Sequence, residues 1–117
     1  MSNRITDCLY LWLDDVRDLP KNDLTKSFLT CDWALSVIQA KDIVLRWFDA
    51  GFNSIYFDLD HDLGDFAKDG GDAIKLIDWL IENYHDKNMK FKFHFHSMNP
   101  VGVENMKNAV SKYWVVC

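Results

Sequence analysis

Short apolar runs of strand length alternate with amphipathic stretches of helix length along this chain, and this alternation limits its fold more than any other feature. The first run, 8–13, is apolar throughout and stops at Asp14 and Asp15, which is typical of a strand buried on both faces. Residues 16–32 show no sustained periodicity, so we expect an irregular segment that could hold one helical turn. The patterns predict further strands at 33–38, 53–59, 90–96 and 114–116, and helices at 40–50, 72–84 and 100–112.

Strands that alternate with helices pair in parallel, because each crossover helix returns the chain to the same end of the sheet. We therefore expect an α/β fold, a three-layer α/β/α sandwich around a five-stranded parallel sheet, in which the first helix is reduced or replaced by a loop. The 117 residues are 49% hydrophobic and 26% charged, which is the composition of a globular protein. We expect a single domain, 1–117.

Charge and cysteine content limit the partners and the compartment. The net charge of -5 argues against binding to the backbone of duplex nucleic acid, but it allows a small phosphorylated ligand or an RNA end. The three cysteines form no CxxC pair, and residues 1–4 lack the layout of a signal peptide. We expect a cytoplasmic protein with reduced thiols and no membrane partner.

Polar side chains follow three of the predicted strands at their carboxyl ends. Because these ends meet at one edge of a parallel sheet, we expect the side chains to approach a common ligand. Carboxylates gathered in this way repel one another unless a cation lies between them, and Mg²⁺ or Mn²⁺ suits carboxylate oxygens best. The candidate metal ligands are Asp14, Asp15, Asp60 and Asp62.

Histidines near the same edge could take part in proton transfer. His61 lies between two acids and could bind metal or donate a proton, and His96 precedes Ser97 and could contact ligand. With Asp60, these two histidines are the candidate catalytic residues. His94 is more simply a polar strand residue, and Asp58 is either a buried polar residue with a partner or an extra member of the cluster, so both stay outside the candidate set.

Three further residues are candidate phosphate ligands, each with an alternative role. Arg17 could hold a phosphate bidentately or pair with a nearby Asp. Ser97 and Asn99 could bond a phosphoryl oxygen or cap the helix that begins near Pro100.

Three local motifs carry a resemblance to a known family. They are LDDVR at 13–17, LDHDLG at 59–64 and HSMNPVG at 96–102. Their acids and their Ser resemble the phosphoacceptor site of response-regulator receiver domains, which have a flavodoxin-like parallel sheet. More narrowly, the motifs are similar to those of the cyclic-phosphate processing receiver domains, and the resemblance covers nearly the whole chain.

The resemblance implies roles for individual residues. Asp14 and Asp15 would hold a divalent cation, Asp60 would occupy the phosphoacceptor position, and Ser97 would occupy the Ser/Thr position of receivers. Receivers place a Lys after their last strand, whereas here only Cys117 follows the predicted one, so we do not expect ordinary phosphotransfer signalling.

Two functions remain open from the sequence. The first is a metal-binding receiver-like domain that binds, and could hydrolyse, a cyclic or terminal phosphate on a nucleotide or RNA-like ligand, as a metal-dependent phosphoesterase or cyclic-phosphate hydrolase. The alternative is a non-catalytic, degenerate receiver that acts as a regulatory module on a protein partner. The chain contains 5 Trp, 4 Tyr and 8 Phe, and these aromatic residues suit the second function if some of them are exposed.

Overall fold

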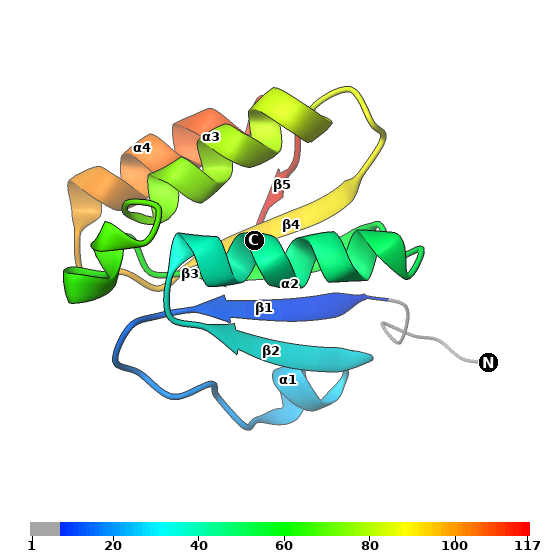
Figure 1. The fold of residues 1–117 in the computed structure, drawn as a ribbon, viewed down its shortest axis with the longest axis horizontal. Coiled ribbons are helices and arrows are strands. Elements are labelled where there is room, and N and C mark those ends of the chain that lie inside the picture. The colour runs from blue at the N-terminus through cyan, green and yellow to red at the C-terminus, as the bar shows by residue number, and fades with distance from the viewer. Residues whose placement is uncertain (1–7) are drawn as a thin grey trace.

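The computed structural model describes residues 8–117, so residues 1–4, where no signal peptide is expected, lie outside it. Five strands form one sheet in the order β2-β1-β3-β4-β5, and every neighbouring pair is parallel (Figure 1). This confirms the predicted parallel sheet. The strands are β1 (Leu9–Leu13), β2 (Thr30–Ala34), β3 (Ser54–Leu59), β4 (Lys90–Phe95) and β5 (Val115–Val116).

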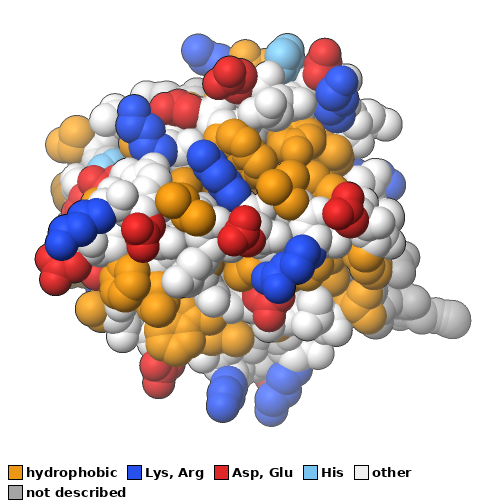
Figure 2. All heavy atoms as spheres, in the orientation of Figure 1, with side chains coloured by type: hydrophobic (Ala, Val, Ile, Leu, Met, Phe, Trp, Pro, Cys, Tyr) orange, Lys and Arg blue, Asp and Glu red, His pale blue; other side chains and the backbone are white. Residues whose placement is uncertain are grey.

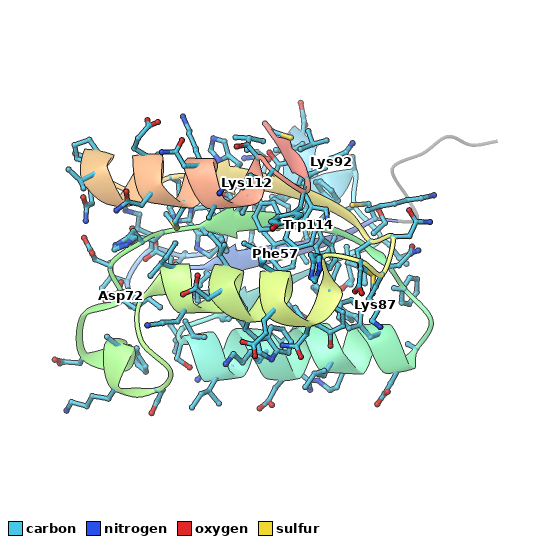
Figure 3. The ribbon with its side chains drawn as sticks, turned by 90° about the horizontal axis from the view of Figure 1, so that it is seen from above. Phe57, Asp72, Lys87, Lys92, Lys112 and Trp114 are labelled. Atoms are coloured by element: carbon cyan, nitrogen blue, oxygen red, sulfur yellow. The ribbon has the colours of Figure 1, made fainter. Side chains whose placement is uncertain are left out.

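Three helices cover one face of the sheet. They are α2 (Val37–Asp49), α3 (Ala73–Tyr84) and α4 (Pro100–Val110), and α3 packs between the other two. Their buried side chains form one cluster with alternate residues of the central strands, such as Leu11 of β1 and Phe57 of β3. Phe57 is labelled in Figure 3. Figure 2 shows apolar and charged side chains interspersed over this helical side of the molecule. No helix within residues 8–117 is long and apolar enough to cross a membrane.

The opposite face of the sheet carries much less cover. Tyr10 and Tyr56 project from it, and Phe28 packs against both rings at centroid distances of 5.1 and 5.3 Å. Phe28 follows the four-residue helix α1 (Asp23–Lys26), which lies in the segment predicted to be irregular. The segment that holds α1 therefore supplies the third layer, with Phe28 over β1 and β3, in keeping with the expectation that the first helix is reduced or replaced by a loop.

The second strand and the start of the next helix were predicted too late in the chain. The structure places β2 at Thr30–Ala34, not at 33–38, and α2 begins at Val37, not at residue 40. Ser36 explains the error, because its hydroxyl accepts a hydrogen bond from the Gln39 N–H at 3.1 Å and so caps the helix. Val37 and Ile38 favour a strand locally, but they occupy the first turn of that capped helix.

Two connections shape the loops at the carboxyl end of the sheet. A short 3₁₀ helix, η2 (Gly64–Lys68), follows β3, and the Asp72 carboxylate, at the start of α3 (Figure 3), accepts the Leu63 N–H at 3.0 Å. At α4, the Asn99 side chain accepts the Gly102 N–H at 2.9 Å, and Pro100 occupies the first helical position. Both hydrogen bonds anchor a loop that carries predicted site residues.

Candidate functional site

The ends of β1, β3 and β4 bring three predicted residues together. The residues that directly follow these neighbouring strands are Asp14, Asp60 and His96, and two main-chain hydrogen bonds continue the sheet there: Asp60 N–H to Leu13 at 2.9 Å and His96 N–H to Leu59 at 3.0 Å. One ligand atom from each of the three side chains lies within 4.8 Å of the other two. We call this group the rim site.

Asp14 is fully buried and its carboxylate is firmly held. One oxygen, Oδ1, accepts the main-chain N–H groups of Val16 and Arg17 at 2.9 and 2.8 Å. The other, Oδ2, lies 2.9 Å from Nε2 of His96. These contacts leave Oδ2 facing the rim site, where its second lone pair remains available to a ligand.

Asp60 is also buried, but it has fewer favourable contacts. Burial raises the pKa of Asp60, and the nearby negative charge of Asp14 raises it further. The hydrogen bond from the Ser97 hydroxyl lowers this pKa, but not enough to cancel the rise. Ser97 is held in turn because its Oγ accepts the Asn99 N–H at 3.1 Å. The structure thus places the predicted Ser97 directly beside Asp60.

The ring of His96 is fixed on every side. Its Nδ1 lies 2.7 Å from Asp58 Oδ1, and its Nε2 faces Asp14. The ring also stacks on Trp12, with a centroid distance of 3.8 Å and an interplanar angle of 4°. The Arg17 guanidinium donates to the His96 carbonyl at 2.9 Å. Only 11% of the His96 side chain is exposed, so its orientation is set by the protein and not by solvent.

Asp58, which sequence reasoning left outside the candidate set, anchors this arrangement. It is buried within β3 and accepts hydrogen bonds from the Tyr10 hydroxyl and from ring nitrogens of His94 and His96. Burial alone would raise the pKa of Asp58, but the hydrogen bonds from His96, Tyr10 and His94 together outweigh burial and lower it. Asp58 pairs in register with His94, so the matching polar positions on two adjacent strands were a usable signal.

Other predicted residues form a second cluster. His61, Asp62 and Asp72 each offer a ligand atom within 4.8 Å of the others, and Nδ1 of His61 lies 2.7 Å from Asp62 Oδ1. The His61 ring lies close against Gly102 of α4, where an added Cβ would come within 2.6 Å of it. The predicted metal ligand Asp62 and the predicted catalytic His61 therefore belong to this group and not to the rim site.

Arg17, Asn99 and Asp15 lie beside these clusters. The Arg17 Nε is 4.0 Å from Asp14 Oδ2, so the structure shows the ion pair that was one of its two predicted roles. Asn99 caps α4, and its amide nitrogen lies 3.3 Å from an oxygen of Asp62. The Asp15 carboxylate sits where a Cβ on Gly64 would come within 2.6 Å of it, outside the group formed by Asp14, Asp60 and His96.

Comparison with known families agrees with this architecture. The family model described as cyclic-phosphate processing Receiver domain matches residues 9–112, a range that contains all three strand ends of the rim site. Neither the curated proteins nor the solved structures contain a match to the chain. The match spans nearly the whole chain and confirms the resemblance carried by the three motifs. The chain belongs to the family of cyclic-phosphate processing receiver domains.

Proposed function

We propose that the rim site binds a divalent metal ion together with a cyclic or terminal phosphate on a nucleotide or RNA-like ligand, and that it hydrolyses the phosphate ester. The observation that carries this proposal is the convergence of Asp14, Asp60 and His96 within 4.8 Å at the ends of three parallel strands. Membership of a family that processes cyclic phosphates supports the choice of ligand.

The donor set suits a metal ion such as Mg²⁺ or Mn²⁺. Asp14 and Asp60 offer carboxylate oxygens, which such ions prefer. When bound, the ion would polarise a phosphoryl oxygen and offset the negative charge of the carboxylates. The raised pKa of Asp60 supports this view, since a carboxylate destabilised by burial and by its neighbour gains from a cation.

The protein's own groups supply the remaining chemistry. Asp60 takes a proton from a water molecule that attacks phosphorus, the ester P–O bond breaks, and a histidine, His61 or His96, gives a proton to the leaving oxygen. Ser97 lies beside Asp60, so its hydroxyl could also bond a phosphoryl oxygen. Arg17 and Asn99 are the remaining candidate phosphate ligands, and the Arg17 side chain is 47% exposed.

Metal binding is tested by calorimetric titration of Mg²⁺ and Mn²⁺ into metal-free protein. We expect saturable binding that is lost in the D14N/D60N double variant and retained in D78N, which removes an exposed carboxylate from α3. Turnover is tested by ³¹P NMR with a 2′,3′-cyclic nucleotide. We expect conversion to the monoester by the wild type with metal and none by D60N, with far-UV circular dichroism to confirm that the variants are folded.

A second candidate function is a regulatory module that binds a protein partner. Three apolar side chains in the segments that follow β1 and β4, Val16, Met98 and Val101, are 73%, 84% and 70% exposed. Exposed apolar groups of this kind are typical of protein interaction sites. Such a module would bind metal but convert no cyclic nucleotide, so the same two assays separate it from the enzyme.

A further inference from the structure

We propose that His96 is itself a metal ligand through Nε2, with Asp58 as the residue that positions its ring, and that the rim site therefore prefers Mn²⁺ to Mg²⁺. This inference rests on the metal site of the proposed function and adds to it both a ligand and a selectivity.

The distances at the rim suit a shared ion. Nε2 of His96 lies 2.9 Å from Asp14 Oδ2, and an Asp60 oxygen lies within 4.8 Å of both. Two ligand atoms at right angles around an octahedral ion, each about 2.1 Å away, are separated by about 3.0 Å. Asp14 and His96 are thus already spaced as adjacent ligands.

The surroundings of the ring match those of a ligating histidine. A histidine that binds metal through one nitrogen almost always donates its other N–H to a carboxylate or carbonyl, which fixes the orientation of the ring. Asp58 occupies that position, 2.7 Å from Nδ1, and hydrogen bonds from Tyr10 and His94 hold Asp58 in place. Stacking on Trp12 fixes the plane of the ring.

An imidazole ligand changes the choice of cation. Mg²⁺ binds few protein groups, nearly all of them oxygen, and keeps several waters, whereas imidazole suits transition metals. Mn²⁺ accepts both carboxylate and imidazole and lies at the weak end of the transition-metal affinity order, so Co²⁺ and Zn²⁺ would bind this donor set more tightly still. We expect the wild type to bind Mn²⁺ at least tenfold more tightly than Mg²⁺.

The decisive experiment is pulsed EPR of Mn²⁺ bound to the wild-type protein. Coordination by His96 predicts modulation from a directly bound ¹⁴N nucleus, which changes frequency when the protein is prepared with ¹⁵N-histidine. The modulation should persist in H61A and H94A and disappear in H96Q. H94A is a matched control because it removes another histidine that contacts Asp58, one that is absent from the rim site.

Calorimetry then separates the ligand from its positioning residue. H96Q should lower Mn²⁺ affinity by tenfold or more with little change for Mg²⁺, and D58N should lower Mn²⁺ affinity about 10- to 100-fold while keeping the nitrogen modulation. Mn²⁺ bound to the wild type without nitrogen modulation would overturn the inference, even if H96Q failed to fold, and would leave the proposed metal site standing. Binding of neither ion to the wild type would overturn both.

Discussion

Replacing Asp58 by asparagine should destabilise the protein by about 3 to 5 kcal/mol at pH 7, because hydrogen bonds to a buried carboxylate are lost. An asparagine keeps one acceptor oxygen, but its amide nitrogen would face groups that are themselves donors. The buried Tyr10 hydroxyl would lack an acceptor, at about 1–3 kcal/mol, and His96 would lose a charged hydrogen bond worth about 1.5–3 kcal/mol. His94 adds little, because 46% of its side chain is exposed and water can replace its contact.

Urea unfolding, followed by tryptophan fluorescence, measures this loss. Y10F is the matched control, since it removes a single donor and leaves the carboxylate, and it should cost about 1 kcal/mol. Because the folded pKa of Asp58 is lowered from 3.8, its stabilising effect is complete above that value and is lost as the pH falls through the folded pKa. The wild type and D58N should therefore converge in strong acid. A difference below about 0.5 kcal/mol at pH 7, within the range of ordinary surface substitutions, would refute this account.

Three further predictions concern other residues. The pKa of Asp60 is raised by burial and by a neighbouring carboxylate, so D60N should stabilise the protein by about 1 kcal/mol at pH 7. Urea unfolding should show no such gain below pH 3.8, where the wild-type carboxyl is neutral in both the folded and the unfolded state. A Cβ on Gly64, where φ is +56, would come within 2.6 Å of the Asp15 carboxylate and displace it, so G64A should cost about 2 kcal/mol in thermal unfolding. G51A, with φ +94 and nothing within 4 Å of the added Cβ, should cost about 1 kcal/mol. Burial raises the pKa of Tyr56 to about 12, so ultraviolet titration should lose a transition near pH 12 in Y56F.

The fold could be predicted from the sequence where a single periodicity governs a segment. The buried run of β1 and the alternating phenylalanines of β4 lie within one residue of the predicted bounds. The region around β2 could not, because two signals conflict there. Val37 and Ile38 favour a strand, and the decisive Ser36 cap is a single hydroxyl whose partner is known only once the helix has formed.

The site was predictable as far as strand ends determine it. Asp14, Asp60 and His96 meet because each directly follows one of three adjacent parallel strands, which the motif positions already indicated. The separation of His61 and Asp62 from them depends on the loop after β3 and its packing against α4, which no periodicity encodes. The role of Asp58 required the register between β3 and β4.

Asp58 and Asp60 lie two residues apart, one within β3 and one just beyond it, yet their environments shift their pKa values in opposite directions. Asp58 receives three hydrogen bonds and is stabilised as a carboxylate, whereas Asp60 faces Asp14 and receives too little to offset burial. A strand that merely needed polar ends would not keep a destabilised acid beside a stabilised one. The contrast fits two different roles. Asp58 fixes the orientation of His96 at the rim site, and Asp60 carries a destabilised negative charge that a bound cation or a proton would neutralise.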